Sequence, residues 1–502
     1  MDLTPSPGLV KRSLAAHGWL GLLVGALMYI VCLTGTLSVF YPEFERWEQP
    51  QVRESLDYDP VVLERAFNDF LAQESLRTEH MYLNLPTEEI PRASVSNQQR
   101  GWFVREDGSL GDEVEHEWTH FIINTHLYLT LPETFGIVLV SSLGAMLVGL
   151  IVSGLLAHPR LFRDAFHLRL RGNGRLDQTD IHNRLSVWGA PFHLLIAITG
   201  AYFGLVTPVL GVVAELTGRD AQTIVSSVFG EEPEVKETGE IRLAAALAEL
   251  SARAPAANPF AVTVHGAGTE RQFLEIHASH PGRMIYSENY RYDSAGNYLG
   301  KAGFSDGEVG KQIVYSMYYL HFGHFGGFAV KLIYFVLGLT LTVVSVTGIN
   351  IWLSKRKHRD ALNDIWAGIV WGVPVALSAS ATSQIAFGFV SPVLFWSVLA
   401  MCVAWSLRRR EPARARQDLI AVWAGLVGLL LTTHLVRFGV DALAPAARTI
   451  NTALLLQLGL LVCLLRRRRT DRSDPSAVAA PERQERFEPR ASPELEKTEA
   501  RA

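Results

Sequence analysis

The chain has 502 residues, of which 48% are hydrophobic and 19% are charged, and its formal net charge is −4. Its three cysteines lie inside apolar runs and form no C-x-x-C pair, which argues against a disulfide framework or a cysteine zinc site. The charge balance gives no reason to expect a nucleic-acid partner. The cysteines are Cys32, Cys402 and Cys463.

Eight apolar runs of about 18–25 residues alternate with polar stretches. Each run is long enough to cross the roughly 30 Å hydrocarbon core of a bilayer. Buried helices of soluble proteins seldom reach this length without charges, so we predict an α-helical integral membrane protein with about eight spans in a lipid bilayer. The runs are 17–40, 135–157, 183–208, 328–353, 365–383, 386–407, 418–438 and 447–465.

Basic residues gather in the short segments on one side of these runs. Because short cytoplasmic segments carry an excess of Lys and Arg, both termini are predicted to be cytoplasmic and the two long polar segments to face outward. The first run is too long for a signal-peptide core and is predicted to stay as a helix. The basic residues are Lys11, Arg12, Arg160, Arg163, Arg169, Arg171, Arg175, Lys355, Arg356, Lys357, Arg359, Arg408, Arg409, Arg410, Arg414, Arg416 and Arg466 to Arg469.

The two long polar segments have the same predicted order of elements, a helix followed by a small antiparallel sheet. In the first segment the helix is Asp57–Gln73 and an acidic-Gly turn lies at 106–109. In the second the helix is Ile241–Ala252 and the turn is Asp293–Gly296. The predicted strands are Met81–Leu85, Ala93–Ser96, Gly101–Arg105, Ala261–His265, Gln272–His277 and Asn289–Tyr292.

Four histidines mark an internal duplication. His17 precedes the pair Thr34-Gly35, and His182 precedes Thr199-Gly200 at a constant offset of 165. His126 and His321 precede the second and fourth runs in the same way, with one residue of slippage. The first 354 residues are therefore two copies of a helix–module–helix unit, and such repeats place functional sites between the copies. The second and fourth runs end in Ser153-Gly154 and Thr347-Gly348.

These histidines form two predicted pairs, His17 with His182 at the cytoplasmic mouths of spans one and three, and His126 with His321 at the outer mouths of spans two and four. Two imidazoles from facing helices can take both axial positions of a haem iron, so the pattern predicts two haems, one near each face. A polar anchor at the membrane edge is the alternative for any single histidine. Zinc fits less well, because no H-E-x-x-H motif is present. The small residues expected to let a flat macrocycle approach are Gly21, Gly25, Gly144 and Gly338.

Other side chains are candidates of lower rank. His193 lies three helical turns after His182 and matches Met28 in the repeat; both are possible iron ligands, with packing or a propionate contact as the alternative. His324 competes with His321 as a ligand. Three cations are candidate partners of haem propionates, with snorkelling at the membrane edge as the other reading. They are Arg12, Arg184 and Lys331.

Residues 355–465 do not continue the repeat and are predicted to form two helical hairpins. His434 lies in this extension and is expected to pack or to make a local hydrogen bond. The tail from 466 is rich in Arg, Glu, Pro and Ser and is predicted to be disordered. The predicted divisions are 1–40, 41–133, 134–208, 209–325, 326–354, 355–465 and 466–502.

Four motifs in order give the chain its resemblance to a known family: His17-x-Trp-x-Gly with Thr34-Gly35, the His126 unit, Asp180–Arg184 with Thr199-Gly200, and Leu320–Gly323 with Thr347-Gly348. With the modules between them, residues 10–356 resemble the PepSY-associated transmembrane family. The resemblance implies PepSY modules in the periplasm, an inner-membrane location and b-type haem. It also implies reduction of ferric siderophores in support of iron uptake. The extension is a departure from the shorter members of the family.

The predicted reaction moves electrons from a cytoplasmic or membrane donor through the His17–His182 site to the His126–His321 site and on to Fe(III) in a siderophore. No Rossmann fingerprint is present, so nicotinamide or flavin is expected on a partner. Two alternatives remain open at this point. One is a non-enzymatic PepSY protein that binds or regulates a peptidase, and the other is a transporter built on the internal repeat.

Overall fold

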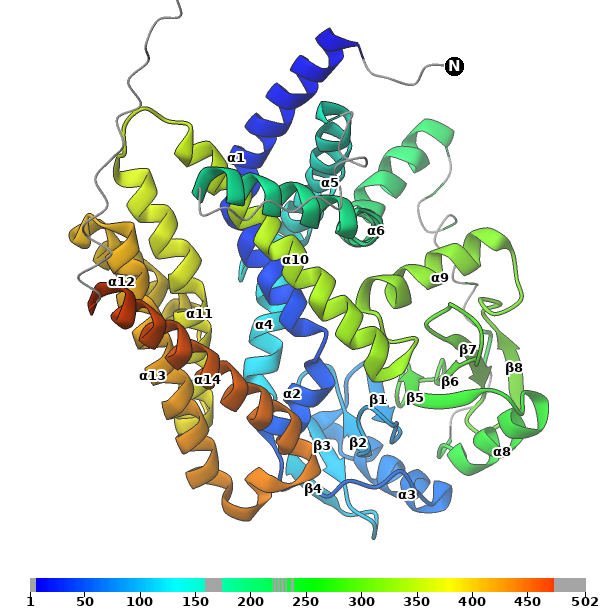
Figure 1. Ribbon diagram of the computed structural model, residues 1–502. Coiled ribbons are helices and arrows are strands. Elements are labelled where there is room, and N and C mark those ends of the chain that lie inside the picture. The colour runs from blue at the N-terminus through cyan, green and yellow to red at the C-terminus, as the bar shows by residue number, and fades with distance from the viewer. Residues whose placement is uncertain are drawn as a thin grey trace, which may run out of the picture.

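The computed structural model describes residues 6–158, 174–218 and 239–473, with isolated positions between 218 and 239. Long helices dominate it, and a single antiparallel sheet lies at one end (Figure 1). The long helices are α1 (Pro7–Ser38), α5 (Glu133–Ala157), α6 (Gly174–Thr217), α10 (Gly327–Ser354), α11 (Ala361–Phe387), α12 (Pro392–Arg409), α13 (Pro412–Phe438) and α14 (Pro445–Ser473).

Seven of these eight helices are long and apolar enough to cross a membrane, so the chain is a multi-pass membrane protein. The eighth, α12, has 18 residues and ends in Arg408 and Arg409, which leaves it short of a full apolar span. The sequence prediction counted it as a span. The basic segment from Arg160 to Arg171 and the tail beyond residue 473 lie outside the described residues, as do the side chains of Arg175 and Arg467 to Arg469.

Four helices, α1, α5, α6 and α10, form the core of the duplicated region. Helix α1 packs against α5 and α10, and α6 packs against the same two helices. Glycines stand at these contacts: a Cβ on Gly144 would lie 3.0–3.1 Å from backbone atoms of Ala197 and Ala201 on α6, and one on Gly338 would lie 2.6 Å from Thr36 on α1. Small residues allow such close approach between membrane helices.

Two further glycines also face a neighbouring helix, Gly25 closely and Gly21 at an ordinary contact distance. A Cβ on Gly25 would lie 2.5 Å from Ile349, and one on Gly21 would lie 3.7 Å from Leu150. Gly21, Gly25, Gly144 and Gly338 were expected to make room for a macrocycle, but they lie at helix–helix contacts. Each of them faces a neighbouring helix.

The two polar modules share one sheet instead of forming two separate sheets. Strands β1 and β5 pair antiparallel, with His80 opposite His265 and Asn84 opposite Ala261, and this pairing joins the modules. The order is β4-β3-β2-β1-β5-β6-β7-β8. The strands are β1 (His80–Asn84), β2 (Ser94–Ser96), β3 (Gly101–Val104), β4 (Leu110–Glu113), β5 (Asn258–His265), β6 (Phe273–Ser279), β7 (Glu288–Tyr292) and β8 (Tyr298–Lys301).

Side-chain alternation gives the sheet one apolar face. Met81, Leu83, Val264 and Ile276 lie in one buried cluster with side chains of α3 (Pro60–Leu71) and α8 (Leu243–Arg253). The six predicted strands and both module helices are confirmed, within a few residues at their ends. Strands β4 and β8 were not anticipated, although the turns before them hold Gly108 and Gly296 at φ of 85° and 84°, where glycine is favoured.

Three short helices join the sheet to the long helices. They are α2 (Tyr41–Glu48), α4 (Glu117–Tyr128) and α9 (Val309–Phe322). None of them was predicted from the sequence. Helix α4 leads into α5 and packs on α1, whereas α9 leads into α10 and packs on α6, so α4 and α9 are equivalent in the two copies. Two 3₁₀ turns, η1 (Glu74–Leu76) and η2 (Gly439–Leu443), are also present in the described part of the chain.

Candidate functional site

The four repeat histidines lie in two pairs. The rings of His17 on α1 and His182 on α6 have centroids 6.2 Å apart and planes at 81°. Those of His126 on α4 and His321 on α9 have centroids 6.1 Å apart and planes at 29°. We call His17 and His182 the inner pair, and His126 and His321, whose helices adjoin the sheet, the outer pair (Figure 1).

The outer histidines are placed differently from the prediction, which put them at the mouths of spans two and four. They lie near the ends of the separate helices α4 and α9, which stop before α5 and α10 begin. Both short helices end in a left-handed residue, Leu129 after α4 (φ 52°) and Gly323 after α9 (φ 73°). From these positions His126 packs against Gly35 of α1, and His321 packs against Gly200 of α6.

Each of the four rings is fixed by a hydrogen bond from its Nδ1–H to a neighbouring helix. In the inner pair, His17 donates to the carbonyl oxygen of Leu150 (2.9 Å), and His182 donates to the carbonyl oxygen of Val344 (3.1 Å) and to Thr347 Oγ1 (3.1 Å). Since a carbonyl oxygen only accepts, these bonds place the proton on Nδ1.

The outer pair uses the same nitrogen. His126 Nδ1–H donates to the carbonyl oxygen of Val31 (2.9 Å). His321 Nδ1–H donates to Thr199 Oγ1 (2.8 Å), whose own hydroxyl proton goes to the carbonyl oxygen of Leu195 (2.7 Å). The tautomer is thus the same at all four positions, and each Nε2 keeps its lone pair.

The glycine of each Ser/Thr-Gly pair of the repeat lies against one of these rings. Gly154 lies under His17, Gly348 under His182, Gly35 under His126 and Gly200 under His321. A Cβ on Gly35 would stand 2.5 Å from the His126 ring, and on the other three 3.2–3.3 Å from the ring carbon Cε1. A Cβ at Gly35 would therefore have to displace the imidazole, whereas at the other three positions a shift of a few tenths of an ångström would admit one.

The spacing within each pair suits a single metal ion between two imidazoles. An iron bound on both sides through a nitrogen at about 2.0 Å puts the ring centres roughly 6–6.5 Å apart. Across the described ranges, no hydrogen bond to the Nε2 atoms of the four rings is present, and no three His, Cys, Asp or Glu side chains gather as a metal site. A haem iron takes four ligands from its macrocycle, so two imidazoles complete its coordination.

The two pairs occupy different levels of the bundle. Along α1, His17 and the acceptor Val31 of the outer pair are 14 residues apart, or about 21 Å at the rise of an α-helix. Along α6, His182 and Thr199 are 17 residues apart, or about 26 Å. This separation is a large part of the thickness of a hydrocarbon core.

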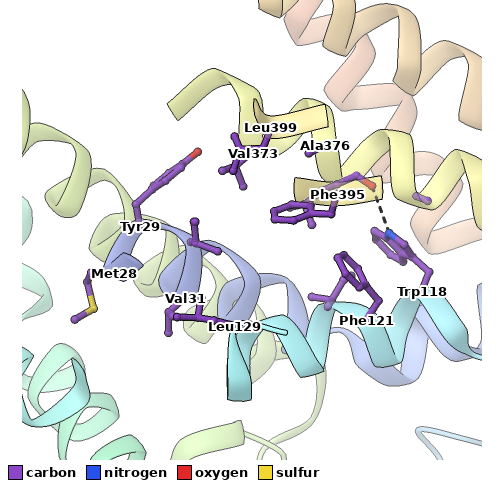
Figure 2. Close-up of a cluster of buried hydrophobic side chains, with 14 of the residues drawn as sticks. Met28, Tyr29, Val31, Trp118, Phe121, Leu129, Val373, Ala376, Phe395 and Leu399 are labelled. Carbon is purple, nitrogen blue, oxygen red and sulfur yellow. Dashed lines mark hydrogen bonds between the residues drawn. The ribbon is translucent and has the colours of Figure 1, made fainter. Parts of the chain in front are cut away.

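His193 and Met28 do not share the arrangement of the four repeat histidines. His193 uses Nε2, the atom left open in the four, to donate to Thr340 Oγ1 on α10 (3.0 Å). The ring thereby links α6 to α10. Met28 is 4% exposed and belongs to a buried apolar cluster with Tyr29 and Val31 (Figure 2).

The remaining candidates are the three cations predicted to contact propionates and His324, predicted as a ligand that competes with His321. Lys331 is 2% exposed, and its Nζ lies 3.1 Å from Glu43 Oε1 and 3.0 Å from Glu89 Oε1, so carboxylates of the chain itself are its partners. His324 Nδ1 lies 3.9 Å from Glu89 Oε2, with its ring 5.2 Å from that of Tyr41. Arg184 is buried within α6, and Arg12 is exposed near the start of α1.

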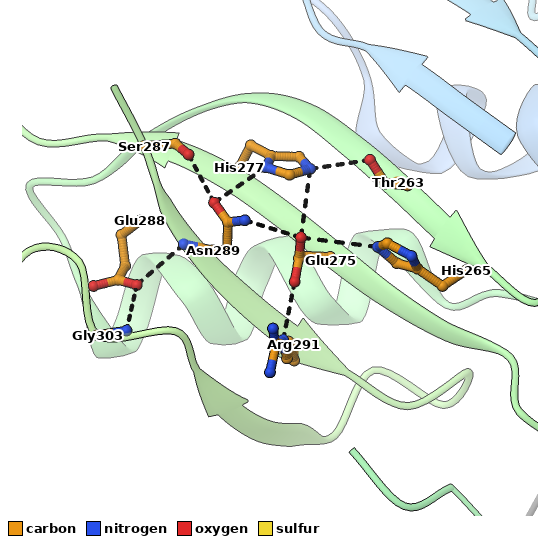
Figure 3. Close-up of polar contacts among 9 residues, drawn as sticks. All are labelled: Thr263, His265, Glu275, His277, Ser287, Glu288, Asn289, Arg291 and Gly303. Carbon is orange, nitrogen blue, oxygen red and sulfur yellow. Dashed lines mark hydrogen bonds and ion pairs between the residues drawn. The ribbon is translucent and has the colours of Figure 1, made fainter. Parts of the chain in front are cut away.

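A second group of titratable side chains lies on the polar face of the sheet (Figure 3). Burial alone would raise the pKa of Glu275, but its neighbours His265, His277 and Arg291 lower that pKa to about 2. Arg291 Nε lies 2.9 Å from Glu275 Oε2, and Asn289 Nδ2 donates to Oε1 (2.9 Å). An ionised carboxylate with this many donors is a satisfied polar network that ties β6 to β7.

Comparison with known proteins places this chain in a family. The sequence profile described as the PepSY-associated TM region matches residues 14–355, which is more than half of the chain. The chain belongs to this PepSY-associated TM family. The matched range contains both histidine pairs, all four Ser/Thr-Gly pairs and the whole sheet, and it ends where the extension α11–α14 begins.

One curated relative of this PepSY-associated chain is an uncharacterised protein, PA4219, of Pseudomonas aeruginosa. The two are 28% identical over 253 residues. The match covers 47% of this chain and 63% of the relative, so it spans less than two thirds of that protein.

The Ser/Thr-Gly pairs stand out in the sequence, but no role was predicted for them. Their contact with the histidines was not visible, because each pair lies on a different helix from the ring it holds. The carbonyl acceptors Leu150, Val31 and Val344 were missed for a further reason: a backbone carbonyl has no signature in a sequence. The constant offset between histidine and Ser/Thr-Gly was the one signal that pointed to a shared role.

Proposed function

We propose that this protein is an inner-membrane electron-transfer protein with one b-type haem at each histidine pair. It would take electrons from a donor on the cytoplasmic side and reduce ferric-siderophore iron in the periplasm, in support of iron uptake. The observation that carries the proposal is the common state of the four repeat histidines. Each ring is held through Nδ1–H, each Nε2 is left with a lone pair, and each pair has the spacing of a bis-imidazole iron site.

The chain's own residues do two things in this proposal. The carbonyl and hydroxyl acceptors on α5, α10, α1 and α6 fix the tautomer and direction of the rings, which raises the basicity of Nε2. The aromatic rings of Phe203 and Phe322 lie 5.5 and 5.6 Å from that of His321 and limit the access of water to the outer pair. A bound haem at each pair would supply a one-electron carrier at each level of the bundle.

The position of the sheet supports the assignment of the outer side as the side of reduction. Both modules join the spans next to α4 and α9, which carry the outer histidines (Figure 1). A substrate bound by the modules would therefore lie close to the outer pair. Fe(III) gains one electron there and becomes Fe(II), which oxygen-rich chelators hold less well, so reduction favours release.

The direct test is reconstitution. Haem-loaded protein is placed in liposomes with a membrane-impermeant reductant inside and a ferric trihydroxamate with an Fe(II)-trapping dye outside. We expect reduced haem bands and coloured Fe(II) complex outside. Haem reduction without Fe(II) would refute siderophore reduction but keep electron transfer, and protein that binds no haem would refute both.

Matched variants make the test specific. His126→Ala and His321→Ala should each abolish external Fe(II) formation while the inner haem stays reducible. His193→Ala is the control, because His193 is buried in the same bundle but has its Nε2 engaged by Thr340. Equal losses of activity in all three variants would contradict the assignment of the outer ligands.

A further inference from the structure

Helices α4 and α9 hold equivalent positions in the two copies, yet only α4 is enclosed. Five side chains of α4 are buried: Trp118, Thr119, Phe121, Ile122 and Thr125. On α9 none of the side chains is buried, and Val309 and Ile313 are 71% and 52% exposed. The outer pair thus has one carrier helix with several fully buried side chains and one whose side chains are at most partly buried.

Helices α1 and α5 pack against α4, and the C-terminal extension covers it further on another side. Trp118 Nε1–H donates to the carbonyl oxygen of Leu377 on α11 (3.4 Å), and the ring of Phe121 lies 5.6 Å from that of Phe395 on α12 (Figure 2). At the other end of α4, Trp396 Nε1–H donates to Thr130 Oγ1 (2.8 Å). The extension therefore holds α4 both two turns before His126 and just after it.

A second route from the extension to α4 runs through α2. The carboxylate of Glu48 accepts from the backbone N–H of Trp118 (3.0 Å) and of Thr119 (2.8 Å), at the N-terminus of α4. The adjacent Trp47 donates from Nε1 to Asn451 Oδ1 on α14 (2.9 Å).

His434 on α13 completes this contact. Its ring stacks on that of Trp47 with centroids 4.7 Å apart, and its Nε2 bonds to the Trp47 carbonyl oxygen (3.0 Å). His434 was expected to pack or to make a local hydrogen bond; it packs on Trp47 and bonds to the backbone of α2.

We infer that α11–α14 act as a fixed seat for α4, and that Trp118 and Trp396 are positioning residues that orient His126 in the outer site. In this chain the inference gives the extension, which lies beyond the family match, a role in the site itself. It rests on the proposed function for its haem readout. Its packing part stands independently, because the contacts of α4 with α11 and α12 require no cofactor.

The experiment uses the full-length protein in detergent, with Trp118→Phe, Trp396→Phe and the double variant. Each change keeps an aromatic ring and removes one hydrogen bond. Trp405→Phe is the matched control, because Trp405 Nε1–H donates to Asp418 Oδ2 (3.1 Å), a residue of the extension itself. The first readout is amide hydrogen exchange of peptides from α4 and α9 measured by mass spectrometry. The second is the EPR spectrum and midpoint potential of each haem.

We expect wild-type α4 to exchange more slowly than α9. Each single variant should speed exchange in α4 by about 2- to 10-fold, with a larger effect in the double variant, and leave α9 and the control unchanged. The EPR signal and potential of the outer haem should shift while those of the inner haem stay constant. The unchanged inner haem would show that the variants fold.

Two results would overturn the inference: unchanged exchange of α4 in the double variant, or faster exchange without any change at the outer haem. A wild-type protein with no haem would contradict the proposed function. The hydrogen exchange of α4 would then test only whether the extension holds α4 in place. Equal shifts at both haems would show a general loosening of the bundle and would also contradict a specific role for Trp118 and Trp396.

Discussion

The inner and outer histidine pairs share their chemistry but differ in the helices that carry them. His17 and His182 lie on the long helices α1 and α6, so packing of the four core helices alone sets their geometry. His126 and His321 lie on the short helices α4 and α9, which adjoin the sheet modules, and α4 also contacts the extension. The comparison indicates that the inner site is a property of the bundle and the outer site a property of the whole molecule.

The largest predicted difference between the two pairs comes from the glycines that lie against the histidine rings. Gly35→Ala places a Cβ 2.5 Å from the His126 ring and must displace it, so we expect loss of the outer haem and retention of the inner one. Gly154→Ala places a Cβ 3.2 Å from His17, where a small movement suffices, and should leave both haems bound. Haem content measured as the pyridine complex distinguishes the two. A normal content of outer haem in Gly35→Ala would contradict the close contact between Gly35 and the His126 ring.

The next effect concerns the acceptors of Nδ1–H. Thr199→Val removes the hydroxyl that His321 bonds to, whereas Thr347→Val leaves His182 its bond to the Val344 carbonyl. Loss of such a partner typically costs about 10- to 100-fold in metal affinity, so Thr199→Val should weaken the outer haem by that factor. Thr347→Val should have a much smaller effect on the inner haem. Haem transfer to apomyoglobin gives the relative affinities, and the opposite order would refute the assigned acceptors.

A third difference needs no substitution. The ring planes of the inner pair are near perpendicular at 81°, and those of the outer pair are closer to parallel at 29°. Low-spin ferric haems with two imidazoles have g anisotropy that depends on this angle. The oxidised protein should therefore give two distinct EPR signals, a strongly anisotropic one lost in His17→Ala and a rhombic one lost in His126→Ala. A single type of signal, or the reverse assignment, would contradict the geometry.

The smallest effect is a pH dependence near the outer pair. Burial raises the pKa of Glu48 to about 7, against the hydrogen bonds from Thr119 and Trp118, and raises that of Glu45 to about 8. The folded state then binds more protons than the unfolded state between about pH 4.5 and 8, so stability falls as pH rises through this window. Glu48→Gln should flatten the fall in thermal midpoint between pH 5 and 8. An equal slope in the variant would rule out Glu48 as a contributor.

Much of the duplicated region could be predicted from the sequence. The constant offset of 165 residues assigned the inner histidines to equivalent positions, and equivalent positions meet across the axis of a duplicated bundle. The alternation of apolar residues likewise identified β1, β5 and β6, because Met81, Val264 and Ile276 each face the same buried side.

Other features leave no such trace. Residues 117–128 and 309–322 mix polar and apolar side chains and run directly into apolar spans, so α4 and α9 were not separated from α5 and α10. The joining of the modules depends on pairing between His80 and His265, which are distant in the chain. The seat of α4 on the extension likewise rests on single contacts such as Trp118 with Leu377 that periodicity does not reveal.

The most direct measurement is the haem stoichiometry of the purified wild-type protein and two double variants, His17→Ala/His182→Ala and His126→Ala/His321→Ala. We predict two b-type haems per wild-type chain and one in each double variant, with different visible and EPR spectra for the two that remain. Wild-type protein without haem, or double variants that both keep two, would contradict the assignment of the paired histidines as haem ligands.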